Sequence, residues 1–189
     1  EKESNYYEKF FSENYGIRFN QKKIVLVTGH RRESFGQGFE SICNAIKKIA
    51  ITNDIEIIYP VHLNPNVQEP VKKILMNIDN IHLIPPLDYA PFVFLMKKSY
   101  LILTDSGGIQ EEAPSLGKPV LIMRNSTERL EGIKSGTGKL VGTKSESILS
   151  EVQLLLDNIK IYNKMSKSNN PYGDGSASIK ICDFIEKNL

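Results

Sequence analysis

The sequence predicts an α/β protein in which helices flank a parallel β-sheet. From about Lys23 onward, short apolar runs alternate with segments whose apolar residues recur every three or four positions. That alternation is typical of βαβ units around a parallel sheet. The chain has 189 residues, of which 40% are hydrophobic, and this is enough for one sizeable core. We therefore expect about one domain.

The apolar runs and periodic segments give the expected elements in order. Strands are predicted at 24–27, 55–59, 81–84, 100–103, 119–123 and 139–141. Helices are predicted at 39–50, from 65 to about 76, and at 92–98 after Pro85-Pro86. Three further helices are predicted from their apolar residues. The first has Ile109, Ala113 and Leu116, the second has Ile148, Val152, Leu155 and Ile159 on one face, and the last has Ile179, Cys182 and Ile185. Residues 1–21 are expected to form a leading helix, followed by a domain at 22–189.

The charge and cysteine content argue against several classes of protein. Lys and Arg together number 24 against 22 Asp and Glu, so the net charge of +2 does not suggest a nucleic-acid surface. Cys43 and Cys182 have no metal or disulfide-framework spacing, which favours a reducing compartment. The sequence has neither a membrane-length apolar run nor a signal-peptide core, so a soluble, cytoplasmic protein is expected. The first residue is Glu rather than Met, which suggests a piece of something longer.

The clearest candidate site is the turn Thr104-Asp105-Ser106-Gly107-Gly108, which follows a predicted strand and opens a helix. Small residues in such a turn let backbone N–H groups and the positive helix end approach an anion. The alternative is that the glycines only permit a tight turn. The spacing fits neither a dinucleotide GxGxxG motif nor a Walker loop. We therefore predict a cradle for the diphosphate of a nucleotide-type ligand.

Glu111 and Glu112 lie one turn into the same helix. A carboxylate near a helix N-terminus is favoured electrostatically without any function, which suffices for one of them. A carboxylate at this place also suits the hydroxyls of a ribose. Glu112 is on the ligand side if Ile109 and Ala113 face the sheet, so the choice between the two depends on geometry.

Polar residues also follow the other predicted strands. His30 and Arg31 come directly after the first strand, and His62 follows the second, so all three are expected at the ligand-binding edge of the sheet. His82 lies within a strand run and is expected to be structural. Arg129 follows the fifth strand and suits an anion, although a capped helix with a solvated charge pair explains it as well. The isolated histidines show no metal-binding spacing, so no metal is expected.

Four segments together resemble the non-hydrolysing bacterial UDP-N-acetylglucosamine 2-epimerases. They are Thr28 to Gly36, Pro60 to Val67, Leu103 to Leu121 and the stretch NPYGDG at 170–175. The resemblance extends from about Lys22 to Leu189, and its most specific part is DSGGIQEEAPSLGKPV. It implies a GT-B type fold with two Rossmann-like halves and a UDP-sugar between them, of which this chain is expected to be the C-terminal half.

The resemblance also implies roles for individual residues. Ser106, Gly107 and Gly108 are expected to hold the diphosphate, Glu112 the ribose, and Phe92 with the Leu87 segment the uracil. Arg129 matches a ligand-contacting arginine, and His30 matches an active-site histidine. Arg31 and His62 match positions that in some members help to bind a second, regulatory UDP-N-acetylglucosamine.

The reaction follows by the same resemblance. The family interconverts UDP-N-acetylglucosamine and UDP-N-acetylmannosamine by eliminating UDP and adding it back, with neither a redox cofactor nor a metal. The product serves cell-surface polysaccharide synthesis, and a homodimer is expected for the full-length protein. The catalytic carboxylates of the family belong to the N-terminal half, so this chain alone is expected to be inactive.

One departure and two alternatives remain open. Leu130 stands where many members have a stiffening proline after the arginine that corresponds to Arg129. A GT-B glycosyltransferase donor domain would share the nucleotide-binding half, although GHRRE and NPYGDG argue against it. A non-catalytic, truncated UDP-sugar binding module is the other alternative.

Overall fold

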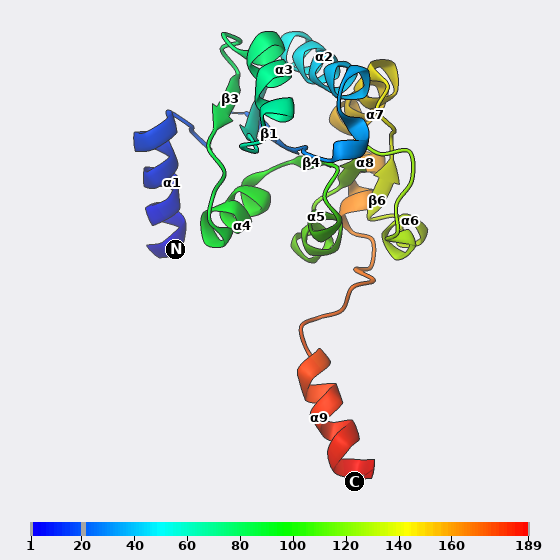
Figure 1. The fold of residues 1–189 in the computed structure, drawn as a ribbon. Helices are drawn as coiled ribbons and strands as arrows, with labels where there is room; N and C mark the ends of the chain where they lie inside the picture. Colours follow the sequence, from blue (N-terminus) through cyan, green and yellow to red (C-terminus); the bar gives the residue numbers. More distant parts are fainter. Residues whose placement is uncertain (1, 20–21, 189) are drawn as a thin grey trace.

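The computed structural model describes residues 2–19 and 22–188, and it confirms the predicted α/β class (Figure 1). The parts of the predicted 1–21 segment at Glu1, Asn20 and Gln21 lie outside the described residues, as does Leu189. The strands are β1 (Lys23–Thr28), β2 (Ile55–Pro60), β3 (Ile81–Ile84), β4 (Leu101–Thr104), β5 (Val120–Ile122) and β6 (Gly138–Leu140). The helices are α1 (Lys2–Tyr15), α2 (Gln37–Thr52), α3 (Pro65–Leu75), α4 (Tyr89–Lys98), α5 (Gly107–Glu112), α6 (Leu130–Ser135), α7 (Ser145–Asp157), α8 (Ile159–Ser166) and α9 (Ala177–Asn188), with 3-10 turns η1 (Arg32–Ser34) and η2 (Ala113–Leu116).

The six strands form one sheet in the order β3-β2-β1-β4-β5-β6, and every neighbouring pair is parallel. From β1 the chain adds β2 and then β3 on one side of the sheet, and it then returns to add β4 on the other side of β1, so the strand order changes direction there. The loops after β1 and β4 therefore leave the same edge of the sheet and diverge. Such a switch point opens a crevice for ligands at the carboxyl ends of the strands.

Both faces of the sheet are buried. On β1, Val25 and Val27 pack with α2, α3 and α7, whereas Ile24 and Leu26 pack with α1 and α4 on the opposite face. This explains why the strand is a continuous apolar run and not an alternating one, since a parallel sheet covered on both sides has no polar face. Phe11 of α1 is fully buried and its ring stacks on Phe94 of α4 at 5.9 Å, so the leading helix has a packing partner in this chain.

Two helices end earlier than the sequence pattern predicted. The helix expected to include Ile159 breaks at Asn158, whose side chain accepts hydrogen bonds from the amides of Lys160 and Ile161 and so starts α8. Ile159 is consequently exposed and does not share the buried face of α7. After α5, Pro114 has no N–H for an α-helical bond, and the chain continues as the 3-10 turn η2.

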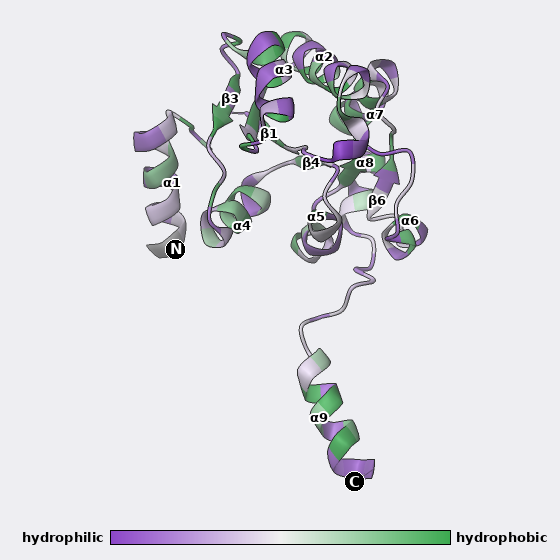
Figure 2. Ribbon diagram, in the orientation of Figure 1, coloured by the Kyte–Doolittle hydropathy of each residue, from purple (hydrophilic) through white to green (hydrophobic). Residues whose placement is uncertain are grey.

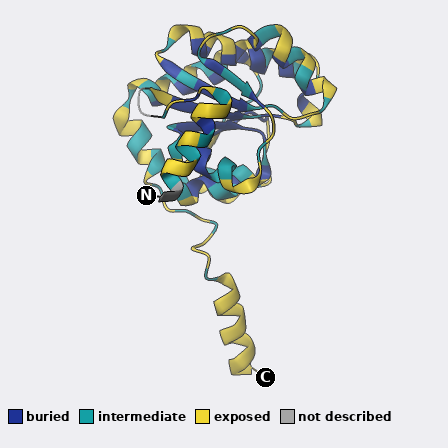
Figure 3. Cartoon of the chain, turned by 90° about the vertical axis from the view of Figure 1, so that its left-hand side faces the viewer, coloured by how far each residue is buried: buried dark blue, intermediate teal, exposed yellow. Residues whose placement is uncertain are grey.

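Helix α9 extends away from the rest of the chain (Figure 1). It is exposed along its whole length, as Figure 3 shows, although it has apolar residues (Figure 2). Ile179, Phe184 and Ile185 of this helix are 63%, 67% and 47% exposed. The predicted apolar side therefore exists, but no described residue covers it. No helix within residues 2–19 and 22–188 has the length and apolar character needed to cross a membrane.

Candidate functional site

A cavity of about 210 Å³ lies at the carboxyl edge of the sheet and brings together five of the predicted site residues. His30 reaches it from the loop after β1, His62 from the loop after β2, and Ser106 from the turn after β4. Leu87 and Phe92 line it from the segment between β3 and β4. A larger hollow of about 650 Å³ lies between α1 and α4, but helix sides line it and not strand ends. We therefore place the candidate site in the smaller cavity.

The turn after β4 has the geometry of an open cradle. Ser106 stands in extended backbone immediately before α5, and its side chain makes no capping bond to the helix. A Cβ atom at Gly107 would lie 3.2 Å from the guanidinium carbon of Arg129, so a larger residue here would displace the end of that side chain. A Cβ atom at Gly108 would meet nothing closer than 3.9 Å, and this residue is exposed. The free space above Gly108 is what a ligand approaching the backbone requires.

The structure distinguishes the two glutamates of α5. The Oε1 atom of Glu111 accepts a hydrogen bond from Nε of Arg129 at 2.7 Å. In contrast, Oε2 of Glu112 is buried and has no hydrogen-bond partner among the described residues. The charge of Glu112 is close enough to raise the pKa of the Tyr89 hydroxyl. An unpartnered buried carboxylate oxygen is costly, so of the two glutamates Glu112 is the one with an oxygen left to accept a further hydrogen bond.

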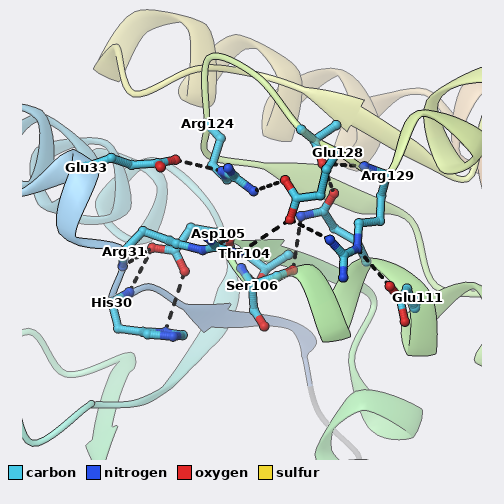
Figure 4. Close-up of polar contacts among 12 residues, drawn as sticks. His30, Arg31, Glu33, Thr104, Asp105, Ser106, Glu111, Arg124, Glu128 and Arg129 are labelled. Carbon is cyan, nitrogen blue, oxygen red and sulfur yellow. Dashed lines mark hydrogen bonds and ion pairs between the residues drawn. The ribbon is translucent and has the colours of Figure 1, made fainter.

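Arginines and glutamates from the loops after β1 and β5 and from helix α5 form a paired cluster beside the cradle (Figure 4). Glu128 is at its centre, with oxygens 2.9 Å from Arg124 and 2.6 Å from Arg129, and 3.6 Å from Arg31. Its own backbone amide and then Arg124 lower the pKa of the Glu128 carboxyl. The Arg124 side chain is only 8% exposed and also binds Glu33 at 2.7 Å. Sequence reasoning missed Arg124, because a buried arginine directly after a strand has no local pattern that marks it.

Arg129 is placed over the cradle but is not free. Its guanidinium contacts Glu111 and Glu128, and the hydrogen bond that it donates to Glu111 is the main cause of its raised pKa. The charge pair that the sequence offered as an alternative explanation therefore exists. Its place over Gly107 also matches the ligand-contacting interpretation, since a phosphate there would compete with carboxylates for the same N–H groups.

Asp105 holds the end of β4 to the end of β1 (Figure 4). Its carboxylate is fully buried, and Oδ2 accepts hydrogen bonds from the amides of His30 and Arg31, each at 2.8 Å. The Arg31 side chain adds a bond from Nε to the Asp105 carbonyl at 3.2 Å. These contacts fix the loop that carries both residues. Asp105 was part of the predicted turn but was not singled out, because its partners are 74 and 75 positions away.

The two predicted site histidines lie together, whereas the third is remote from them in the sheet. The rings of His30 and His62 stack with centroids 5.1 Å apart and planes at 10°. His82 lies on β3 and its Nε2 is 2.8 Å from a carboxylate oxygen of Glu56 on β2, which is a hydrogen bond between neighbouring strands. No group of three or more His, Cys, Asp and Glu residues suited to a metal occurs in the described part of the chain.

The loop at 170–175 contacts α6 and the 3-10 turn η2. The hydroxyl of Tyr172 accepts a hydrogen bond from the amide of Gly132 in α6 at 3.0 Å. Asn170 donates to Ser115 in η2 at 2.9 Å. The loop therefore links the helix after Arg129 to the helix after the cradle, which explains how two distant motifs belong to one site.

The fold and the site together define a parallel α/β domain with an open strand-to-helix turn at its switch point. The sequence profile of the UDP-N-acetylglucosamine 2-epimerase family matches residues 3–186, and the chain belongs to this family. The UDP-N-acetylglucosamine 2-epimerase of Campylobacter jejuni is 61% identical over 169 residues, which are 89% of this chain and 44% of that protein. The protein of the same name from Escherichia coli K12 is 57% identical over 176 residues, 93% of this chain and 47% of that protein.

A solved structure shows the same fold with a ligand. The UDP-GlcNAc 2-epimerase from Neisseria meningitidis, bound to UDP-GlcNAc, has a TM-score of 0.91 and 44% identity to this chain. The match covers 99% of this chain and 50% of that one. The chain thus spans about half the length of the relatives that it matches.

Proposed function

We propose that this chain is the UDP-sugar-binding half of a UDP-N-acetylglucosamine 2-epimerase. The observation that carries the proposal is the buried, unpartnered Oε2 of Glu112, one helical turn from the open backbone at Gly108. Ribose hydroxyls are donors that would satisfy this oxygen, and a diphosphate attached to the ribose would then reach the cradle. A ligand with both groups is a nucleoside diphosphate.

Each predicted site residue has a role in the proposed complex. The backbone at Ser106, Gly107 and Gly108 binds the diphosphate, and Glu112 binds the ribose. The uracil lies against Phe92 and the Leu87 segment, which line the cavity. Arg129 contacts the phosphates after exchanging one of its carboxylate partners, and His30 faces the sugar side of the ligand as the active-site histidine.

The proposed reaction breaks the bond between the anomeric carbon and the β-phosphate oxygen of UDP-N-acetylglucosamine. The electron pair of this bond goes to UDP, a base takes the proton from C2, and a double bond forms between C1 and C2. Adding UDP back with a proton on the opposite face of C2 gives UDP-N-acetylmannosamine. Negative charge on the β-phosphate grows in the elimination, so backbone N–H groups and Arg129 stabilise the transition state more than the ground state.

In the described part of the chain, each carboxylate beside the cradle already has a partner or an assigned role, so none of them is left to act as the base for C2. Glu33, Glu111 and Glu128 are paired with arginines, and Asp105 is buried behind His30. Glu112 is assigned to the ribose. The proposal therefore includes a second domain, supplied by a longer protein, that carries the catalytic carboxylates.

The wider setting of the protein also belongs to the proposal. Arg31 and His62 stand beside His30, where they would contact a second, regulatory UDP-N-acetylglucosamine next to the substrate. The longer protein would act as a homodimer in the cytoplasm and supply cell-surface polysaccharide synthesis. In the relatives named above, the shared half is matched at 57% and 61% identity, which supports a shared activity.

Calorimetry with UDP tests the binding part of this proposal. Native protein is expected to bind UDP at one site, and Ser106→Leu is expected to abolish binding because the side chain fills the mouth of the cradle. Ser150→Leu, at an exposed position of α7, is the control and should bind as the native protein does. Unchanged affinity in Ser106→Leu would remove the cradle from this role. NMR of UDP-N-acetylglucosamine incubated with the chain should show no manno epimer, and its accumulation would contradict the assignment of the base to another domain.

A further inference from the structure

The buried carboxylate of Asp105 uses its two oxygens differently. Oδ2 accepts both loop amides, from His30 and Arg31, at 2.8 Å. Oδ1 is buried and has no hydrogen-bond partner among the described residues. A fully buried carboxylate oxygen without a partner is unusual, because each such oxygen is normally satisfied by a donor. The unpartnered oxygen therefore points to a missing interaction.

The nearest polar group to this oxygen for which the structure gives a distance is the imidazole of His30. Its Nδ1 is 3.6 Å from Oδ1, which is an ion-pair distance slightly longer than a hydrogen bond, as Figure 4 shows. Catalytic hydrogen bonds are often this long in the absence of ligand and shorten when it binds. An ionised carboxylate can only accept hydrogen bonds, so the orientation favours a proton on Nδ1. Placing the Nδ1 lone pair against Oδ1 would be repulsive.

We propose that Asp105 is the positioning residue for His30, fixing the tautomer with the proton on Nδ1 and leaving the Nε2 lone pair available in the cavity. Under the proposed function, on which this consequence rests, the ligand then meets a histidine that accepts a hydrogen bond at Nε2. The carboxylate that orients His30 belongs to the same turn that forms the cradle, because Asp105 directly precedes Ser106. Binding of the phosphates and orientation of the histidine are thus properties of one segment.

The other two histidines have the opposite tautomer by the same reasoning. Nδ1 of His62 accepts the amide of Asn64 at 3.1 Å, so neutral His62 carries its proton on Nε2. Nε2 of His82 donates to Glu56 at 2.8 Å, which again places the proton on Nε2. The chain has three histidines, so His30 is expected to be the single one protonated on Nδ1.

Two-bond nitrogen–proton NMR correlation of the histidine side chains tests the proposal directly. The ligand-free, nitrogen-15-labelled protein is measured in alkaline buffer, and the nitrogen shifts themselves identify the neutral rings. His30→Gln, His62→Gln and His82→Gln assign the three rings. The expected result is the Nδ1–H pattern for His30 and the Nε2–H pattern for the other two. An Nε2–H pattern for His30 in the native protein would overturn the proposal without any further variant.

Asp105→Asn provides a second test within the same spectrum. The asparagine oxygen can keep accepting the two loop amides, while its NH₂ group takes the place of Oδ1 and donates to Nδ1 of His30. His30 should therefore switch to the Nε2–H pattern, with His62 and His82 unchanged. Asp79→Asn, at an exposed position, is the control and should leave all three patterns as they are.

A purely structural role for Asp105 would leave the His30 pattern unchanged in Asp105→Asn, and this result would contradict the proposal. If the variant does not fold, the native pattern of His30 still decides. Because no ligand is present in any sample, failure of UDP binding would not affect the outcome. The test therefore separates this inference from the proposed function.

Discussion

Replacing Gly108 by alanine should make the protein more stable and, at the same time, weaken its binding of UDP. Gly108 is the second residue of α5 and has no positive φ, so alanine fits the backbone. The added Cβ would approach Oε1 of Glu112 at 3.9 Å and Oγ of Ser106 at 4.0 Å, which are ordinary contact distances. Alanine in a helix is favoured over glycine by up to about 0.5–1 kcal/mol. The melting temperature of Gly108→Ala should therefore rise by about 1–4 °C.

The same methyl group would stand where the proposed diphosphate meets the backbone. Displacing the phosphates so that one amide hydrogen bond to a charged oxygen is lost costs about 1.5–3 kcal/mol. This corresponds to a loss of roughly 10- to 150-fold in UDP affinity. Thermal unfolding without ligand measures the first effect, and calorimetric titration with UDP measures the second.

Gly38→Ala is a matched control for this substitution. Gly38 is also the second residue of its helix, α2, and its Cβ would meet only Thr143 at 3.8 Å or more. This variant should gain similar stability and bind UDP with native affinity. Gly108→Ala with native affinity would show that the phosphates do not approach the backbone there. A loss of stability in Gly108→Ala would mean that the space above Gly108 is needed by the fold itself.

Three further predictions concern Glu112, Tyr172 and the cysteines. Glu112→Ala should bind UDP no more tightly than it binds the 2′,3′-dideoxy analogue of UDP, because the loss of one charged hydrogen bond to the ribose lowers the UDP affinity roughly tenfold or more. Glu111→Ala should still bind UDP more tightly than the dideoxy analogue in the same calorimetric titrations. Tyr172→Phe should lower the free energy of unfolding in urea by about 1–3 kcal/mol, because an amide of α6 loses its acceptor, and an unchanged urea midpoint would contradict this. Mass spectrometry after brief alkylation of the native protein should find Cys182 modified and Cys43 protected. Cys182 is exposed, whereas burial raises the pKa of the Cys43 thiol to about 12. Modification of Cys43 in the folded protein would contradict the packing of α2.

The strands could be predicted because their apolar runs are local and continuous. A parallel sheet covered on both faces leaves no ambiguity about a run such as Ile24 to Val27, so all six strands were found within one or two residues. The helix break at Asn158 was missed because a side-chain cap competes with an apolar period that continues through it. Periodicity predicted α9 as a helix, but periodicity does not reveal whether an apolar face is covered.

The candidate site was predicted in part for the same reason. Residues that follow strands in the sequence necessarily meet at one edge of a parallel sheet, which is why His30, His62 and Ser106 share a cavity. Reasoning from the residues alone left Glu111 and Glu112 undecided, because Arg129, the partner of Glu111, comes from another loop. Asp105 and Arg124 gain their importance from burial and from distant partners, and neither property is visible in a local pattern.

Amide NMR of the labelled chain during a UDP titration tests the central claim most directly, because it reports on the cradle itself. The account predicts that the backbone N–H signals of Gly107 and Gly108 move and saturate together on one binding curve, with signals from Phe92 and Glu112 following the same curve. Signals of α9, which extends away from the cavity, should stay in place. Saturable binding that leaves Gly107 and Gly108 unmoved, or no saturable binding at all, would contradict the account.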